Sequence, residues 1–172
     1  MVEITGKVTV QGKPVTLLGN LPKVGDRAPD FTVMDNDLKP LSISRFAGKR
    51  LIILSVPSLD TPVCDLETRR FNTKAEKLGE DLTILVISMD LPFAQKRWCG
   101  VSGVKRVVTA SDHRESTFGL NYGVLIKELR LLARAVFVID RDRVIRYVQL
   151  VKEAGEEPDY DAALNAVRNL QE

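Results

Sequence analysis

Three short apolar runs constrain the fold of this chain more than any other feature of its sequence. They are residues 51–56 (LIILSV), 82–88 (LTILVIS) and 135–139 (AVFVI). Each run is rich in β-branched or large apolar side chains and shows no clear alternation with polar ones. Such runs are typical of central strands that are buried on both faces of a sheet. We therefore expect a sheet that is covered on both sides.

Segments with helical periodicity lie between and after these runs. Residues 63–78 carry an apolar stripe with charges elsewhere, residues 92–99 form a shorter candidate helix, and residues 159–170 form an amphipathic one. Gly100 follows the second segment and is the expected C-cap. Strands that alternate with helices indicate an α/β layer structure.

The remaining strand candidates lie near the two ends of the chain. Two alternating runs, 2–10 and 14–18, flank a Gln-Gly-Lys-Pro turn and predict an N-terminal β-hairpin. Residues 31–34 form a short strand candidate. Residues 143–151 follow the run at 135–139 so closely that the two are expected to pair antiparallel.

Length and charge limit the remaining possibilities. The 172 residues fit one domain, 1–172. The 25 basic and 23 acidic residues give a net charge of +2, which is too even to indicate nucleic acid or a membrane surface as partner. No run approaches the roughly 20 apolar residues of a membrane span, and the N-terminus lacks the apolar stretch of a signal peptide. We expect a soluble cytoplasmic protein.

No cofactor or metal site is expected. The sequence AGKR at 47–50 resembles a phosphate-binding loop only superficially, because the spacing GxxxxGK[ST] fails, and GxGxxG does not occur. His113 is the single histidine and is expected on the surface. The two cysteines form neither a CxxC motif nor a cluster with zinc-ligand spacing.

Cys64 stands where a cysteine becomes reactive. The segment 57–64 (PSLDTPVC) follows a buried strand and precedes a helix. Thr61 is the expected N-cap and Pro62 the first helical residue, which puts Cys64 in the first turn. Unpaired backbone N–H groups and the positive end of the helix dipole favour a thiolate there, and the thiolate is the nucleophile.

The residues around Cys64 leave an alternative open. Asp65 and Glu67 add negative charge to the same turn, whereas Arg69 and Arg70 lie further along the helix. The spacing does not decide which of these side chains points toward the sulfur. A buried, inert cysteine beneath a capped helix is the competing interpretation.

The same segment carries a family resemblance. PSLDTPVC fits the PxxxTxxC signature of the peroxiredoxins, with Pro57, Thr61 and Cys64 in the three fixed places. Further stretches resemble the bacterial thiol peroxidase branch, a group of atypical two-cysteine peroxiredoxins. These stretches are 24–31 (VGDRAPDF), 58–72 (SLDTPVCDLETRRFN), 88–99 (SMDLPFAQKRWC), 118–124 (FGLNYGV), 131–140 (LLARAVFVID) and 156–164 (EEPDYDAAL).

The resemblance implies a fold and a reaction. The fold is thioredoxin-like, with a central mixed sheet flanked by helices and extended by the N-terminal hairpin, residues 1–18. Cys64 would attack a hydroperoxide and become a sulfenic acid. Thr61 would hydrogen-bond the peroxide and the sulfur, Arg134 would lie beside them, and Pro57 would shape the loop. Without the resemblance, Thr61 is simply a helix cap and Arg134 either a solvated residue at a strand end or an inward paired charge.

Cys99 matches the resolving cysteine of this branch. It would condense with the sulfenic acid on Cys64 to form an intramolecular disulfide. A disulfide requires Cα atoms within about 7 Å, and these cysteines lie on separate helix candidates, so we expect both helices to unwind partly. The alternative for Cys99 is a small buried residue beside Trp98.

The resemblance also implies partners. Thioredoxin would reduce the disulfide, the protein would form a homodimer, and alkyl hydroperoxides would be preferred over hydrogen peroxide as substrate. Two other classes of function remain open. The same cysteines could serve a redox-sensing or chaperone-like protein without fast turnover, or form a structural disulfide in a non-catalytic thioredoxin-like domain.

Overall fold

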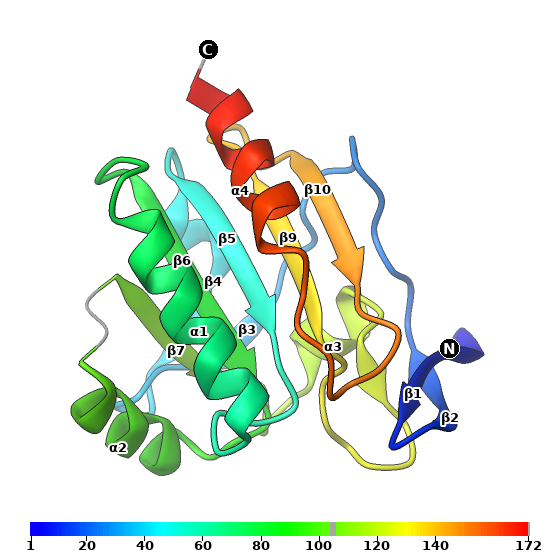
Figure 1. Ribbon diagram of the computed structural model, residues 1–172. Helices are drawn as coiled ribbons and strands as arrows, with labels where there is room; N and C mark the ends of the chain where they lie inside the picture. The colour runs from blue at the N-terminus through cyan, green and yellow to red at the C-terminus, as the bar shows by residue number, and fades with distance from the viewer. Residues whose placement is uncertain (104–105, 172) are drawn as a thin grey trace.

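The computed structural model describes residues 1–103 and 106–171 (Figure 1). Its largest element is a seven-stranded sheet in the order β10-β9-β5-β6-β7-β3-β4. The three apolar runs form its centre, as β5 (Arg50–Ser55), β6 (Leu82–Ser88) and β9 (Ala135–Ile139). β5 pairs with β6 in parallel and with β9 antiparallel, so the predicted mixed sheet is confirmed.

The outer strands of this sheet were predicted less completely. β10 (Ile145–Leu150) pairs antiparallel with β9, and β3 (Thr32–Met34) lies close to its predicted place. Two strands, β4 (Pro40–Ser42) and β7 (Val107–Ser111), were not predicted from the sequence. β4 is too short to show a period of two, and β7 mixes polar and apolar residues. These strands are identified by their pairing with neighbours and not by local pattern.

Each central strand contributes to two separate cores. Ile52 and Leu54 of β5 belong to an apolar cluster shared with α1 (Pro62–Ala75) and α4 (Tyr160–Arg168). Leu51 and Ile53 of the same strand belong to a second cluster on the opposite face. Because successive side chains point to opposite faces, a strand covered on both sides must be apolar at every position. This requirement explains the absence of alternation in the three runs.

The helices α1 and α4 lie side by side on one face of the sheet (Figure 1). α1 ends at Ala75, earlier than the predicted 63–78, and the chain leaves it through a turn in which the Leu78 N–H donates to the Ala75 carbonyl. Asp159 is the N-cap of α4, and its side chain accepts a hydrogen bond from the backbone N–H of Ala162. A 3₁₀ turn, η2 (Asn169–Gln171), completes the predicted helix.

The second crossover helix is longer than expected. α2 (Pro92–Ser102) continues past Gly100, so the prediction that Gly100 caps it is wrong. The residue in the left-handed conformation is Gly103, with φ of 72°, and a glycine adopts that conformation at little cost. A glycine inside a helix costs only about 1 kcal/mol, which the rest of the helix tolerates. Cys99 therefore lies inside α2 and not at its end.

The N-terminal hairpin is confirmed, with a tighter turn than expected. β1 (Glu3–Val10) and β2 (Lys13–Leu18) are joined by Gln11 and Gly12, both with positive φ. Pro14 belongs to β2 and pairs with Thr9. β2 also pairs antiparallel with β8 (Leu125–Ile126), so the hairpin and β8 form a separate three-stranded sheet.

The second face of the seven-stranded sheet is covered by this small sheet together with two short helices. They are η1 (Ile43–Phe46), a 3₁₀ helix, and α3 (Thr117–Asn121). Buried residues of all three elements share one apolar cluster with the face of β5 turned away from α1. The thioredoxin-like α/β arrangement is thus covered on both sides, as the sequence predicts.

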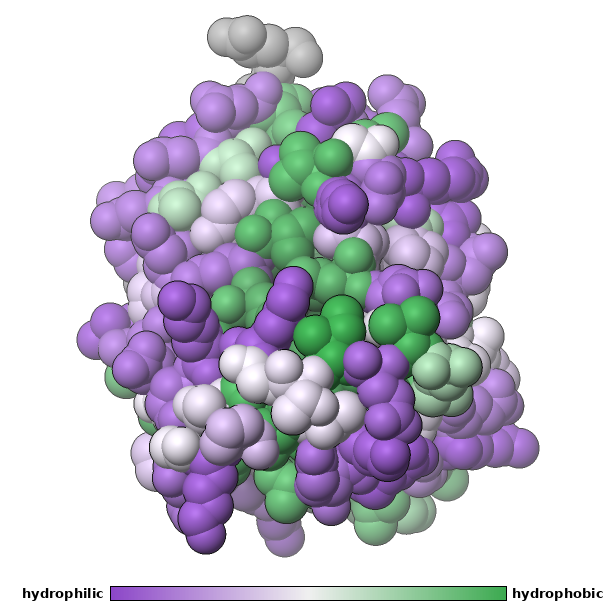
Figure 2. All heavy atoms as spheres, turned by 90° about the vertical axis from the view of Figure 1, so that its right-hand side faces the viewer, coloured by the Kyte–Doolittle hydropathy of each residue, from purple (hydrophilic) through white to green (hydrophobic). Residues whose placement is uncertain are grey.

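Figure 2 views the molecule from the side of β10 and the hairpin. Apolar side chains gather in the middle of this face, and hydrophilic side chains surround them. Within residues 1–103 and 106–171, no helix has the length and hydropathy needed to cross a bilayer.

Candidate active site

The loop from β5 to α1 positions the start of the helix. Thr61 has extended backbone angles, and its Oγ1 accepts a hydrogen bond from the Cys64 backbone N–H at 3.3 Å. The predicted N-cap is therefore confirmed, with Pro62 and then Cys64 in the first turn. The Thr61 hydroxyl donates to the Ser58 carbonyl oxygen at 3.0 Å, so its proton points back into the loop. Pro57 is half-buried in a bend of the same loop.

The side chain of Cys64 is fully buried between α1 and the sheet. It belongs to the cluster that includes Val56, Leu59, Phe71 and Trp98. Apolar surroundings lower the local dielectric, so a charge placed next to this sulfur acts more strongly than it would in water. The sulfur thus lies in an enclosure where a single donor can control its chemistry.

That donor is Arg134, which directly precedes β9. Its Nη2 lies 3.2 Å from the Cys64 Sγ, and the residue is 1% exposed. Of the two placements that the sequence left open, the structure has the inward one. The Nε and Nη2 atoms donate to the Ala154 carbonyl at 3.0 and 2.8 Å, and Nη1 donates to Glu67 Oε2 at 2.5 Å. These contacts hold the planar guanidinium with one N–H directed at the sulfur.

Glu67 is a site residue whose orientation the sequence left open, and the structure places it beside Arg134. Its side chain is fully buried, and its second oxygen, Oε1, has no hydrogen-bond partner among the described residues. Burial raises the pKa of Glu67 to about 7, although the Arg134 guanidinium lowers it. Burial lowers the pKa of Arg134, but the Cys64 sulfur and Glu67 raise it overall. Glu67 follows Cys64 by three positions, and this spacing places both on one face of the helix.

Asp65, the other acidic residue of this turn, points elsewhere. It accepts hydrogen bonds from Trp98 Nε1 at 2.7 Å and from Arg69 Nε at 2.9 Å. Arg69 in turn donates to the Ser102 carbonyl at 2.8 Å. Asp65 and Arg69 therefore connect α1 to α2, and Glu67 alone of the two acidic residues joins the buried charges around Cys64.

The second cysteine is close to the same cluster but faces different partners. Cys99 is half-buried, and it packs against the cluster that includes Cys64 and Trp98. Its sulfur lies 3.3 Å from Thr109 Oγ1 and 3.8 Å from Asn36 Nδ2. Both cysteines are free thiols in this structure, and the disulfide between them stays a prediction.

Other polar features do not join the site. His113 is half-buried, and its Nδ1 forms a hydrogen bond with the Ser111 hydroxyl at 2.8 Å. Among the described residues, no group of three or more His, Cys, Asp or Glu side chains is placed to hold a metal ion.

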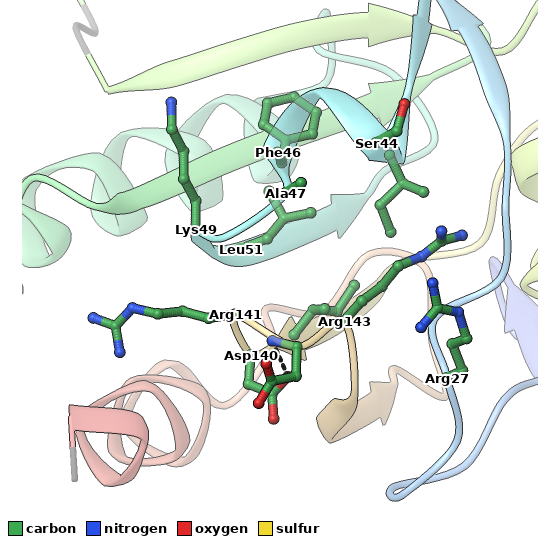
Figure 3. Close-up of a pocket in the computed structure, with 12 residues that line it drawn as sticks. Arg27, Ser44, Phe46, Ala47, Lys49, Leu51, Asp140, Arg141 and Arg143 are labelled. Carbon is green, nitrogen blue, oxygen red and sulfur yellow. Dashed lines mark hydrogen bonds between the residues drawn. The ribbon is translucent and has the colours of Figure 1, made fainter.

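A hollow of about 330 Å³ lies elsewhere, between η1, the start of β5 and the β9–β10 turn (Figure 3). Basic, acidic and apolar side chains line it together. Leu51 pairs with Ile139 at that end of the sheet, whereas Ser55 pairs with Ala135 at the end next to Arg134. The hollow is therefore at the far end of the β5–β9 pair from Cys64 and takes no part in the site.

This arrangement can support one kind of chemistry particularly well. A cysteine in the first turn of a helix faces unpaired N–H groups and a fixed guanidinium, and both stabilise a thiolate. The same guanidinium can stabilise negative charge on an oxygen that approaches the sulfur. The site is thus built for nucleophilic attack by sulfur with an anionic leaving group.

Comparisons with known proteins agree with this chemistry. The Redoxin family matches residues 23–164. Thiol peroxidases from Staphylococcus aureus and Oceanobacillus iheyensis are 52% and 57% identical to this chain; the alignments cover 95% and 92% of it and 99% and 96% of those proteins.

Solved structures give the same result. A peroxiredoxin-like protein from Aquifex aeolicus has a TM-score of 0.88 at 45% identity, covering 96% of this chain and 98% of that one. A thiol peroxidase from Chromobacterium violaceum has a TM-score of 0.87 at 22% identity, over 94% and 95% of the two chains, which supports the fold alone. The chain belongs to the Redoxin family and, within the peroxiredoxins, to the thiol peroxidases, which are thiol-dependent peroxidases.

Proposed function

We propose that Cys64 is the sulfur that attacks the peroxide. Its thiolate attacks one oxygen of a hydroperoxide, the O–O bond breaks, and the leaving oxygen takes up a proton to become an alcohol or water. Cys64 is left as a sulfenic acid. The observation that supports this role is the contact of 3.2 Å between Arg134 Nη2 and the buried Cys64 Sγ at the start of α1.

In this scheme Arg134 and Thr61 serve the reacting oxygens. Arg134 stabilises the thiolate and then the charge that grows on the leaving oxygen. Thr61 caps the helix, and its hydroxyl turns from the Ser58 carbonyl toward the peroxide when the substrate binds. Pro57 keeps the loop closed over the sulfur. Glu67 holds the guanidinium of Arg134 in place.

We further propose that Cys99 resolves the sulfenic acid. Its sulfur attacks the Cys64 sulfur, an S–S bond forms, and water leaves. A dithiol protein such as thioredoxin then reduces the disulfide by thiol–disulfide exchange. We propose alkyl hydroperoxides as the preferred substrates, a homodimer as the assembly and the reducing cytoplasm as the compartment that suits this cycle.

The test is the intact mass of the protein after one equivalent of cumene hydroperoxide, with a sulfenic-acid trap present. Wild type should rapidly lose two hydrogens, Cys99→Ser should carry the trap on Cys64, and Cys64→Ser should not react rapidly. If Cys64→Ser reacts as fast as wild type, Cys64 is not the attacking sulfur. Steady turnover with a thioredoxin system separates the peroxidase from a redox sensor, which would form the disulfide without turning over.

A further inference from the structure

Cys99 is part of a closed ring of three hydrogen-bonded side chains. Asn36 lies in the turn between β3 and β4, and Thr109 is a buried residue of β7. Thr109 Oγ1 donates to Asn36 Oδ1 at 2.9 Å, Asn36 Nδ2 donates to Cys99 Sγ at 3.8 Å, and Cys99 Sγ lies 3.3 Å from Thr109 Oγ1. The ring therefore joins α2 to β7 and to the turn between β3 and β4.

The proton count of this ring requires a thiol. The single hydroxyl proton of Thr109 is used by Asn36, so Thr109 Oγ1 can only accept from the Cys99 S–H. If the amide of Asn36 were turned over, the ring would run in the opposite direction, and the Cys99 S–H would donate to Asn36 Oδ1. In both directions one proton must be on sulfur for all three bonds to exist. The closed ring thus holds the Cys99 thiol on two sides, and these bonds must break before the sulfur can move.

The ring also fixes where the sulfur points. The hollow of about 350 Å³ beside it is lined by Cys99, Asn36, Thr109 and neighbouring residues of β7 and the β3–β4 turn. Cys64, in contrast, is enclosed between α1 and the sheet with Arg134 as its partner. Cys99 must leave the ring before it can reach Cys64.

We propose that Asn36 and Thr109 are positioning residues that restrain the resolving cysteine. This inference rests on the proposed function. The ring slows disulfide formation and so prolongs the life of the sulfenic acid on Cys64. A longer-lived sulfenic acid is more exposed to a second peroxide, which oxidises it to sulfinic acid and releases water or alcohol. Asn36 and Thr109 would thereby set how much peroxide the enzyme tolerates.

Other contacts hold α2 as well, and they remain when the ring is broken. Gln95 Nε2 donates to the Ser88 hydroxyl and the Ala110 carbonyl, at 2.9 and 2.8 Å, and Trp98 donates to Asp65. Loss of the ring should therefore speed disulfide formation by a moderate factor, about three- to tenfold for one or two neutral hydrogen bonds.

The experiment compares Thr109→Val and Asn36→Ala with wild type. Thr109→Ser keeps the hydroxyl and should behave as wild type. Thr83→Val is a second control, because it makes the same substitution as Thr109→Val in the neighbouring strand β6. Rapid mixing with cumene hydroperoxide, quenching and mass analysis give the amounts of sulfenic acid, disulfide and sulfinic acid over time. Trp98, next to Cys99 in the sequence and the only tryptophan, reports the second step by fluorescence.

The inference predicts an unchanged rate of sulfenic acid formation in all variants. Disulfide formation should be about three- to tenfold faster in Thr109→Val and Asn36→Ala, with less sulfinic acid at high peroxide. An equal or slower second step with a normal first step would overturn the inference. If wild type forms no sulfenic acid on Cys64, the proposed function fails instead.

The ring can also be tested without peroxide. In a Cys64→Ser background, Cys99 is the only thiol that an alkylating reagent can label. Thr109→Val should raise its labelling rate near neutral pH by about the same three- to tenfold factor, because the sulfur is no longer held in the closed ring. A labelling rate equal to that of the Thr83→Val control would contradict the restraint whatever the outcome with peroxide.

Discussion

Two buried arginines show how the same residue can serve stability in one place and chemistry in another. Arg50 and Arg134 are each 1% exposed, and each stands at the start of a central strand. β5 and β9 are antiparallel neighbours, so the two side chains lie at opposite ends of the strand pair. Among the described residues, Arg50 donates to carboxylate and carbonyl oxygens, whereas Arg134 directs one N–H at the sulfur of Cys64. The difference lies in the acceptors and not in the arginine.

The carboxylate partners differ as well. Asp81 is paired with Arg50 and is 35% exposed, and its pKa is lowered by the hydrogen bond from Arg50. Glu67 is paired with Arg134 and fully buried, and its pKa is raised to about 7. The Arg50 pair is therefore ionised throughout the neutral range. In the Arg134 pair the carboxyl group titrates within that range, so the charge beside the guanidinium varies with pH.

The largest effect is expected when the arginine beside the sulfur is removed. Arg134→Gln should slow the reaction of Cys64 with peroxide by about a hundredfold to a thousandfold, the usual cost of losing a donor to developing negative charge. Single-turnover stopped-flow kinetics measure this rate. Arg50→Gln is the matched control and should leave the rate of the folded protein unchanged. Equal losses in both variants would mean that a buried arginine acts on the chemistry only through the fold.

Removal of the other arginine should affect stability. Arg50→Gln removes the guanidinium that donates to Asp81 and to the carbonyls of Leu78 and Val167, and among the described guanidinium groups Asp81 keeps only its contact with the exposed Arg141. We expect a loss of about 3 kcal/mol in the free energy of unfolding, measured by urea denaturation. The value lies at the low end for a broken buried pair because Asp81 can be hydrated. A loss no larger than that of a surface substitution would show that Arg50 is not a main stabilising contact.

The pH dependence of stability should expose the difference between the two carboxylates. The pKa of Glu67 is about 7 in the folded protein against 4.5 for the free group, so the folded state holds this proton more tightly. The stability that comes from this tighter proton binding by Glu67 is fully present below pH 4.5, and it is lost as the pH rises through about 7. Glu67→Gln removes this loss. Relative to wild type, the variant should gain about 1–3 kcal/mol between the two ends of that window.

Urea midpoints across the same pH window measure this gain. Asp112, whose pKa is raised to about 6 by burial, is present in both proteins and cancels in the difference. Glu76→Gln, at the exposed end of α1, is the control and should show no such trend. A difference between Glu67→Gln and wild type that does not vary with pH would rule out titration of Glu67.

The smallest effect is expected at the second arginine that contacts Asp81. Arg141 Nη2 lies 2.6 Å from Asp81 Oδ2, but the Arg141 side chain is 49% exposed. Arg141→Ala should cost less than about 1 kcal/mol, since an exposed pair gains little over hydration, and added salt should reduce the cost further. Thermal or urea unfolding checks this value. A loss as large as that of Arg50→Gln would remove the distinction between buried and exposed partners.

Local signals predicted the centre of this molecule well. The three apolar runs became the central strands because a strand covered on both faces must be apolar at every position. Thr61 and Pro62 marked the start of α1 because capping depends on residues only a few positions apart. Strands as short as β4 and β8 carry no such pattern, so the sequence analysis missed them. Gly100 failed as a cap because only the backbone conformation, found at Gly103, distinguishes the two glycines.

The sequence by itself determined that a cysteine begins a capped helix after a buried strand, within a recognisable family motif. Only the tertiary structure decided what surrounds that cysteine. Arg50 and Arg134 both stand at the start of an apolar run, and Asp65 and Glu67 lie in one helical turn, so local pattern does not separate them. The order and direction of the strands bring Arg134 to Cys64. Glu67, and not Asp65, lies on the face of α1 that carries Cys64. Contacts between residues far apart in the chain depend on how the elements pack, and short-range periodicity carries no record of that packing.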